Sequence, residues 1–228
     1  MIKTVLLDLD DTILDFHAAE GTAIRQTFRS VGIPDDDATV NRYSEINRAT
    51  WHRLEIGELT REEVLVERFR LLFGELRADA DPIKTQAIYE DLLSREHPFI
   101  DGAVELLEGL YTKYDLYVAS NGTPLVQDRR IAESGIAHYF KGIFISERIG
   151  ANKPSREFFD RAFAAIDSFS RESAVIVGDS LTSDILGGKG AGIITCYFNP
   201  KARKNETGIT PDYEIRSLKE LPSLLERI

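Results

Sequence analysis

The sequence predicts an α/β fold in which a doubly wound parallel sheet is interrupted by an all-helical insertion. Short apolar runs without polar alternation recur along the chain, as is typical of parallel strands that are buried on both faces. Helical segments separate the later runs, and such alternation of strand and helix indicates a parallel sheet. Between residues 15 and 97 no run is typical of a strand, and the pattern is helical.

Five apolar runs are the predicted strands, at residues 4–7, 116–119, 143–145, 174–177 and 193–198. Each later helix begins with a start signal, which is an aspartate, a proline or a capping-box serine, at Asp101, Pro124, Pro154 and Ser217. Strands and helices therefore alternate from residue 101 to the end of the chain.

The inserted segment is predicted to contain helices over residues 18–31, 38–54, 61–73 and 82–95. Thr60 and Glu63 form a capping-box pair, and Asp81-Pro82 is a favourable helix start. A typical crossover between two parallel strands is far shorter than this segment.

Extra structure after the carboxyl end of a strand lies where open α/β sheets bind ligands. We therefore expect a Rossmann-like catalytic core formed by residues 1–14 and 98–228. Residues 15–97 are expected to form a helical cap over the active site.

The composition is that of an ordinary folded protein, since 43% of the 228 residues are hydrophobic and 29% are charged. The net charge of −10 disfavours extended contact with a nucleic-acid backbone, so no nucleic-acid polymer is expected as a partner. A single cysteine, Cys196, excludes an intramolecular disulfide. No signal-peptide pattern or membrane-spanning run is found, so we expect a cytoplasmic protein without a membrane partner. These features assign no oligomeric state.

Three acidic residues follow the first predicted strand directly, in the run Asp8-Leu9-Asp10-Asp11-Thr12. Unpaired buried carboxylates are costly, so acids at the end of a strand require a cation, donors or solvent. A magnesium ion suits them because it prefers oxygen ligands. One carboxylate could attack phosphorus, and a second could protonate the leaving oxygen and then activate water. Taken alone, the run is also compatible with a solvated acidic turn.

Two further clusters supply groups that can bind phosphate. In Ser120-Asn121-Gly122, after a predicted strand, a hydroxyl, an amide and a flexible backbone can donate to phosphate oxygens, although Asn-Gly is also a turn signal. Lys153 precedes Pro154 at a helix start, where its charge and the helix amides can neutralise phosphate. The alternative for Lys153 is a solvated surface charge.

A fourth cluster, Gly178-Asp179 with Asp184 five residues later, again places acids after an apolar strand. Asp179 could complete a magnesium site with Asp8. Asp184 could hold a metal-bound water or orient Lys153. The alternatives are a tight turn at residues 178–179 and a favourable helix N-terminal charge at Asp184.

The four clusters resemble, in order, the motifs of the haloacid dehalogenase superfamily of phosphatases, and the match covers essentially the whole chain. The resemblance implies that Asp8 attacks phosphorus and binds Mg²⁺ through its other oxygen. It implies that Asp10 is the general acid/base and binds Mg²⁺ through its backbone carbonyl. Asp179 is then the third protein ligand, with Asp184 behind it.

The same resemblance implies that Ser120, Asn121 and Lys153 hold the transferring phosphoryl group and that Thr12 supports the first loop. It also implies that the insertion is the superfamily's helical cap. The superfamily's dehalogenases lack the second aspartate of the first motif, so Asp10 favours phosphate chemistry over carbon–halogen chemistry.

Further details are similar to the YjjG-type pyrimidine 5′-nucleotidases, among them Asn47, Trp51 and Arg68 in the insertion and residues 183–188 after the fourth cluster. This similarity implies a phosphohydrolase whose substrate is a pyrimidine nucleoside monophosphate. Three alternatives stay open. They are a phosphatase of another small metabolite such as a sugar phosphate or phosphoglycolate, a β-phosphoglucomutase-like isomerase, and a non-catalytic binding module.

Overall fold

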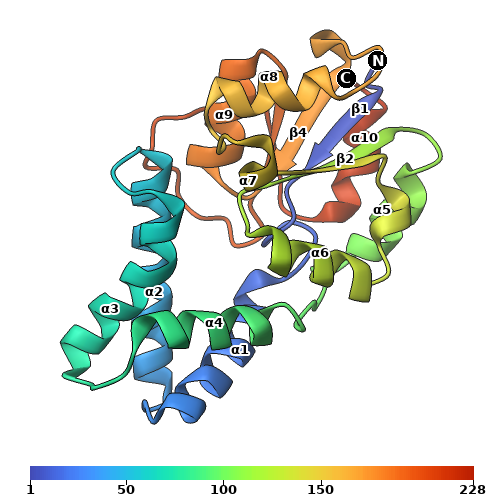
Figure 1. The fold of residues 1–228 in the computed structure, drawn as a ribbon. Helices are drawn as coiled ribbons and strands as arrows, with labels where there is room; N and C mark the ends of the chain where they lie inside the picture. The colour runs from blue at the N-terminus through green and yellow to red at the C-terminus, as the bar shows by residue number, and fades with distance from the viewer. The chain divides into compact units, whose positions relative to one another are not determined.

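A computed structural model describes the whole chain, residues 1–228 (Figure 1). The chain forms two compact units. The larger unit comprises Met1–Phe16 and His97–Ile228, and the helical unit comprises His17–Glu96.

A six-stranded parallel sheet lies at the centre of the larger unit. In chain order its strands are β1 (Thr4–Leu7), β2 (Asp115–Ser120), β3 (Gly142–Ile145), β4 (Ala174–Gly178), β5 (Ile194–Phe198) and β6 (Tyr213–Ile215). The spatial order is β3-β2-β1-β4-β5-β6, which is the order of doubly wound nucleotide-binding sheets. The predicted α/β fold class is therefore confirmed.

The reversal of strand order occurs at β1, which pairs with β2 on one side and β4 on the other. Leu7, the last residue of β1, lies opposite Val118 and Val177. β4 ends one residue beyond Val177 and β2 ends two residues beyond Val118, so the three strands end close to one another at the same edge of the sheet. Open α/β sheets bind their ligands outside the carboxyl ends of the strands at such a point.

Helices cover both faces of the sheet (Figure 1). In chain order they are α5 (Ala103–Leu110), α6 (Pro124–Glu133), α7 (Ser146–Ile149), α8 (Arg156–Ala164), α9 (Leu186–Ala191) and α10 (Leu221–Leu225). A π-helical turn spans Leu181–Ile185, and 3-10 turns span Ala137–Tyr139, Arg171–Ser173 and Leu218–Glu220.

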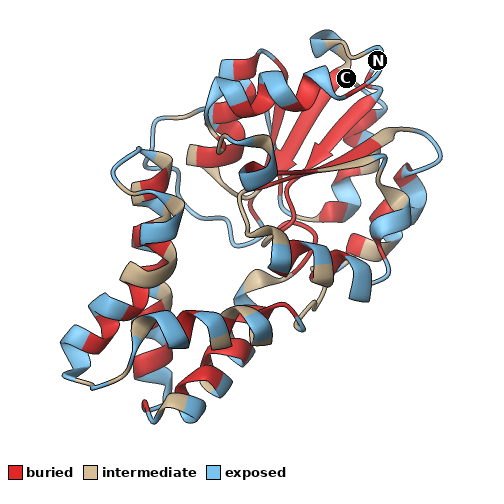
Figure 2. Cartoon of the chain, in the orientation of Figure 1, coloured by how far each residue is buried: buried red, intermediate tan, exposed pale blue.

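The alternation of side chains along β1 divides the core of the larger unit into two layers. Val5 and Leu7 pack with apolar side chains of α5 and α10, whereas Leu6 packs with Phe158 and Phe159 of α8. Both faces are covered, so β1 and β4 are buried over their whole length, as Figure 2 shows. This double burial explains why these strands read as apolar runs without polar alternation.

Among the strands, the edge strand β6 is the one that the sequence pattern does not predict. Only Ile215 of its three residues is buried, and Tyr213 and Glu214 are exposed. An edge strand needs one partner and one covered face, so it lacks the continuous apolar run on which the prediction depends.

Four helices form the helical unit: α1 (Phe16–Val31), α2 (Asp37–Glu55), α3 (Arg61–Leu76) and α4 (Pro82–Leu93). The start signals predicted for α3 and α4 are confirmed, because Thr60 and Glu63 form a capping box and Asp81 caps α4. At α5 the N-cap is Gly102, so Asp101 does not cap that helix. The core of this unit is aromatic. The ring of Tyr43 lies 5.8, 5.2 and 5.7 Å from the rings of Phe28, Phe69 and Tyr89.

A buried polar network joins all four helices of this unit. Asn47 of α2 donates to Glu20 of α1 (2.6 Å) and accepts a hydrogen bond from Arg68 of α3 (2.8 Å). Arg68 also donates to Gln86 of α4 (2.6 Å). Burial raises the pKa of Glu20, and the hydrogen bond from Ser44 and the charge of Arg68 oppose that rise. Arg68 is therefore the cation that balances a buried carboxylate.

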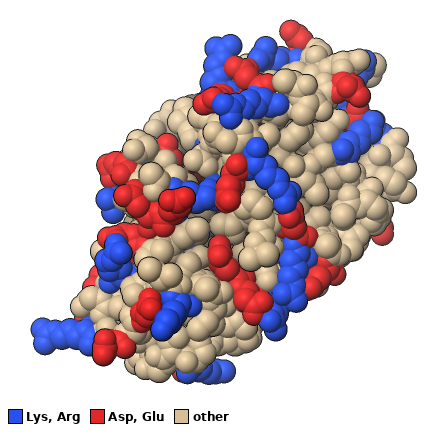
Figure 3. Space-filling view, viewed as in Figure 1, with Lys and Arg blue, Asp and Glu red and all other residues tan.

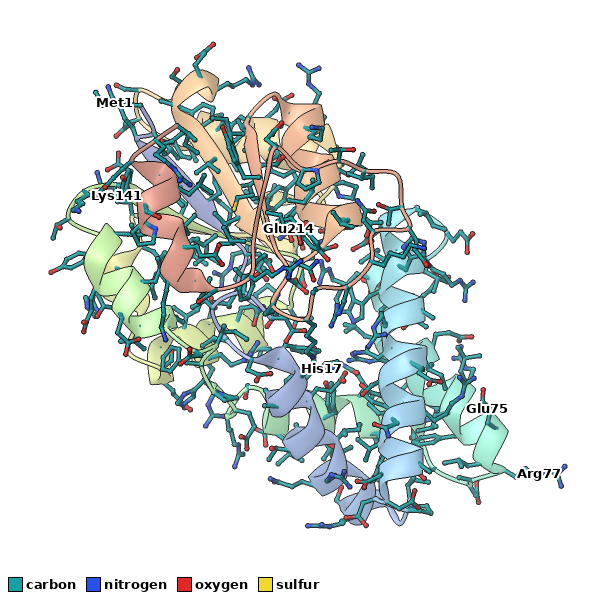
Figure 4. The ribbon with its side chains drawn as sticks, turned by 180° about the vertical axis from the view of Figure 1, so that it is seen from behind. Met1, His17, Glu75, Arg77, Lys141 and Glu214 are labelled. Carbon is teal, nitrogen blue, oxygen red and sulfur yellow. The ribbon has the colours of Figure 1, made fainter.

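Surface ion pairs differ from this network in their exposure to solvent. Arg42 of α2 donates two hydrogen bonds, of 2.8 and 2.7 Å, to Glu75, which is labelled near the end of α3 in Figure 4. Acidic and basic side chains are interspersed over the face drawn in Figure 3. No helix combines the length and apolar character that a membrane span requires.

The contrast between these two arginines gives the first prediction. Replacement of Arg68 by Met leaves Glu20 buried without its cation, so the free energy of unfolding of the helical unit should fall by about 3 kcal/mol. The matched Arg42→Met variant removes an exposed pair and should lose less than about 1 kcal/mol. Urea unfolding followed by the fluorescence of Trp51, the single tryptophan, reports on this unit. Equal losses in the two variants would contradict the prediction.

Candidate active site

The loop after β1 is a tight hydrogen-bonded turn that carries Asp8 and Asp10. The backbone N–H of Asp8 still pairs with Val177 O of β4 (2.9 Å). The N–H groups of Ile13 and Leu14 then both donate to Leu9 O, at 3.0 and 2.9 Å. The turn fixes the backbone of both aspartates at the carboxyl end of the central strand.

Lys153 lies in the interior of this site, with only 1% of its surface exposed. Its ammonium Nζ donates to Asp8 Oδ1, Asp184 Oδ1 and the backbone oxygen of Ala119, each at 2.6 Å. An ammonium has three protons, so all three are used. The lysine thereby joins the first and fourth sequence clusters to the end of β2, and the alternative of a solvated surface charge is wrong.

The positive charge of Lys153 does not balance the negative charges of the carboxylates around it. Burial alone would lower the pKa of Lys153, but Asp184 and Asp8 outweigh burial and raise it. Burial raises the pKa of Asp8, Lys153 opposes that rise, and Asp184 and Asp10 add to it. The pKa of Asp179 is also raised, first by burial and then by Asp8 and other neighbouring carboxylates. One ammonium thus faces an excess of carboxylates.

A divalent cation fits this excess of negative charge. Oxygen atoms of Asp8, Asp179 and Asp184 all lie within 4.8 Å of one another. Asp184 is held on both oxygens, by Lys153 and by the N–H of Ser180 (3.1 Å). The half-buried carboxylate of Asp179 accepts no hydrogen bond. Carboxylate oxygens are the ligands that Mg²⁺ prefers, and Asp179 offers such oxygens without a protein partner.

The carboxylate of Asp10 is not part of the acidic cluster. Gln127 Nε2 donates to Asp10 Oδ2 (2.6 Å), and Arg130 Nη1 donates to Asp10 Oδ1. Both donors come from α6. Both carboxylate oxygens of Asp10 are therefore occupied. The atom of Asp10 that remains for a metal is its backbone carbonyl oxygen, as the resemblance implies.

The hydroxyl of Ser120 is oriented by two donors. Gly122 N–H and Gln127 Nε2 both donate to Ser120 Oγ, at 3.0 and 2.8 Å. A hydroxyl has two lone pairs and one proton, so the proton of Ser120 remains for an incoming acceptor. A phosphate oxygen is such an acceptor.

The side chain of Asn121 positions Lys153. Asn121 Nδ2 donates to the backbone oxygen of Lys153, and Lys153 N–H donates to Asn121 Oδ1, both at 2.9 Å. The amide that the sequence analysis assigns to phosphate is thus used to fix the lysine backbone. If Asn121 contacts phosphate, the donor is its backbone N–H and not its side-chain amide.

Two residues act through the space that they fill or leave open. A Cβ on Gly178 would collide with the carboxylate and Cβ of Asp184, so glycine lets Asp184 approach Lys153. Thr12 is fully buried, and its hydroxyl has no hydrogen-bond partner. The structure therefore shows Thr12 in contact with its surroundings through packing and not through a hydrogen bond of its hydroxyl.

Sequence reasoning missed Gln127 and Arg130. Both are buried on α6, and they lie three residues apart, hence on one face of the helix. The available signal is this pair of polar residues beside the apolar core residues Val126 and Ile131. That signal is weak without the fold, because it does not show that the face meets Asp10.

Comparison with known proteins agrees with these observations. The sequence model of the haloacid dehalogenase-like hydrolases matches residues 2–192. The HAD-hydrolase YfnB of Bacillus subtilis (strain 168) is 43% identical over 223 residues, which cover 98% of this chain and 95% of the relative. A solved structure of YfnB bound to magnesium has a TM-score of 0.94 at 42% identity and covers 98% of both chains.

Two relatives are named pyrimidine 5′-nucleotidases. PynA of Streptococcus pneumoniae is 37% identical over 226 residues, covering 99% of this chain and 95% of the relative. YjjG of Escherichia coli (strain K12) is 28% identical over 221 residues, covering 97% and 96%. The resemblance inferred from the four motifs is confirmed, and the chain belongs to the haloacid dehalogenase-like hydrolases.

Proposed function

We propose that this hydrolase is a magnesium-dependent 5′-nucleotidase that removes phosphate from pyrimidine nucleoside monophosphates through a phosphorylated Asp8. One observation carries the chemical part of the proposal. Buried Lys153 holds Asp8 and Asp184 together at the carboxyl end of the central strand, beside the acidic cluster. Nucleophile, cation and metal ligands are then within reach of one phosphoryl group.

In the first step Asp8 attacks phosphorus, and a new bond forms between its carboxylate oxygen and phosphorus. The bond between phosphorus and the ester oxygen breaks, and the leaving oxygen takes a proton from the carboxyl group of Asp10. Ser120 donates its hydroxyl proton to a phosphoryl oxygen. Lys153 balances the charge on the transferring group.

In the second step a water molecule attacks phosphorus of the phosphorylated Asp8. The carboxylate of Asp10 takes a proton from this water, and the bond between phosphorus and the Asp8 oxygen breaks. Inorganic phosphate leaves, and Asp8 and Asp10 return to their starting forms.

Asp8, Asp179 and the backbone carbonyl of Asp10 are the proposed protein ligands of Mg²⁺. The chemistry that Mg²⁺ supplies when bound is neutralisation of the negative charge shared by these carboxylates and the phosphoryl oxygens. Asp184 acts from behind the ligands by holding Lys153 and the N–H of Ser180.

The substrate class is supported by the relatives named pyrimidine 5′-nucleotidases, which align over almost the whole chain. We assign the role of a cap to the helical unit, because it is inserted directly after the loop that carries Asp8 and Asp10. Asn47 and Arg68, which carry part of the resemblance, are buried inside this unit. Their role is therefore structural, and substrate contacts must come from exposed residues.

The substrate is tested by phosphate release from a matched panel with Mg²⁺. The panel contains thymidine, uridine, adenosine and guanosine 5′-monophosphates, glucose 6-phosphate and phosphoglycolate. We expect the pyrimidine nucleotides to have the highest kcat/KM. A preference for glucose 6-phosphate or phosphoglycolate would overturn the substrate class but keep the chemistry. Isomerisation of β-glucose 1-phosphate in the presence of glucose 1,6-bisphosphate, without hydrolysis, would indicate a mutase.

The nucleophile is tested by Asp8→Asn. Loss of the attacking oxygen should lower kcat by about 10³-fold or more, with the fold retained in circular dichroism. The control is Asp115→Asn at the opposite end of the sheet, where the carboxylate pairs with exposed Lys141, and its activity should be unchanged. Full phosphatase activity of Asp8→Asn would show that another group attacks phosphorus.

Asp179 gives a prediction that does not depend on turnover. Its folded pKa is raised, so its ionised form costs stability once the pH exceeds its unfolded pKa. Without metal at pH 7.5, Asp179→Asn should therefore be more stable than the natural protein.

With Mg²⁺ the order should reverse, because only the natural protein retains the ligand and gains stability by binding. Thermal unfolding in EDTA and in excess Mg²⁺ measures both effects. An equal Mg²⁺-induced rise in Tm for the two proteins would exclude Asp179 as a ligand.

A further inference from the structure

The face of α6 that is turned into the larger unit carries two buried polar side chains. Gln127 is 1% exposed and Arg130 is fully buried. Val126 and Ile131 of the same helix are apolar core residues, so this part of the unit accepts ordinary hydrophobic side chains. Burial of a guanidinium costs free energy unless the charge is paired, and a role in packing alone would not require it.

Both side chains are directed at Asp10. Gln127 Nε2 donates to one carboxylate oxygen (2.6 Å), and Arg130 Nη1 donates to the other. Arg130 Nη1 also donates to Gln127 Oε1 (3.1 Å), so the two side chains support each other. A carboxylate held on both oxygens has a fixed plane and a fixed direction.

Gln127 also relates Asp10 to the proposed phosphate site. The second proton of its amide is donated to Ser120 Oγ (2.8 Å). The side chain of Gln127 therefore fixes the distance between the carboxylate of Asp10, the proposed acid/base, and the hydroxyl of Ser120, the proposed phosphate donor. A Cβ on Gly122 would collide with the amide of Gln127, so the glycine of the Asn-Gly pair leaves the space that this contact needs.

Arg130 is itself fixed from a third direction. Its guanidinium lies 5.9 Å from the ring centre of Phe16, in a cation–π arrangement. Asp10, Ser120, Gln127, Arg130 and Phe16, which these contacts join, all belong to the larger unit.

We infer that Gln127 and Arg130 are positioning residues that hold the carboxyl group of Asp10 toward the leaving oxygen of the substrate. The inference rests on the proposed function, in which Asp10 donates a proton to that oxygen. Its consequence is selective, because proton donation matters for a poor leaving group such as an alkoxide. A good leaving group such as p-nitrophenolate departs without a proton.

The test compares kcat/KM for two substrates in Arg130→Met, Gln127→Leu and Arg130→Lys. One substrate is thymidine 5′-monophosphate, or the alkyl monophosphate of the panel that the enzyme hydrolyses fastest. The other is p-nitrophenyl phosphate. The ratio kcat/KM reports the steps up to phosphorylation of Asp8, in which the leaving group departs.

We expect Arg130→Met to lower kcat/KM for the alkyl substrate by about 10²-fold and for p-nitrophenyl phosphate by less than about 5-fold. Gln127→Leu should show the same selectivity, and Arg130→Lys should recover part of the loss. The matched control is Arg129→Met on the same helix, whose side chain pairs with Glu133 (2.6 Å) at the surface, and it should leave both values unchanged.

Introducing Arg130→Met into an Asp10→Asn variant distinguishes a positioning role of Arg130 from a role in folding. In Asp10→Asn the proton donor is already absent, so adding Arg130→Met should change kcat/KM less than about 2-fold. An equal loss on both substrates, or the full loss repeated in the Asp10→Asn background, would show a structural role and overturn the inference. Unchanged or increased kcat/KM for the alkyl substrate in both Arg130→Met and Gln127→Leu would overturn it as well. Failure of the proposed function is recognised separately, by turnover that survives Asp8→Asn.

Discussion

The arrangement of the site depends on one buried ammonium. Lys153 follows β3 and α7 in the chain, yet its Nζ donates to the end of β2, to the loop after β1 and to the turn after β4. A buried cation must be paired, and this requirement draws Asp8 and Asp184 to one point. The amide of Asn121 fixes the lysine backbone, and the absence of a side chain at Gly178 admits Asp184. Each motif thereby constrains another.

A second constraint follows from the first, because Lys153 neutralises too little charge. The pKa values of Asp8 and Asp179 are both raised, and Asp179 has no hydrogen-bond donor of its own. The folded chain thus holds carboxylates together against their repulsion, and the parallel sheet supplies the rigidity to do so. In the proposed function a divalent cation binds between these carboxylates and the phosphoryl group. The cation relieves the repulsion between the carboxylates, and this relief favours its binding.

The sequence was sufficient for the features that local chemistry encodes. Buried strands such as β1 and β4 are apolar runs, and the cap of α3 is a Thr60–Glu63 pair, so both are visible in short windows. The acids of the site could be found because each follows an apolar run. The contacts of Arg130 with Asp10 could not be found in this way, because they join residues 120 positions apart. The direction of the Asn121 amide, toward Lys153, is likewise set by tertiary packing.

The proposed reacting groups lie in one unit of the chain, and the inserted helices form the other. Every side chain with a proposed part in bond making, proton transfer or metal binding lies in the larger unit, and so do the α6 residues that hold Asp10. The buried network around Arg68 is closed within the helical unit. Exposed residues of the helical unit can therefore change without disturbing the reacting groups. A fold of this kind can retain one phosphoryl-transfer centre while its relatives act on different small phosphates.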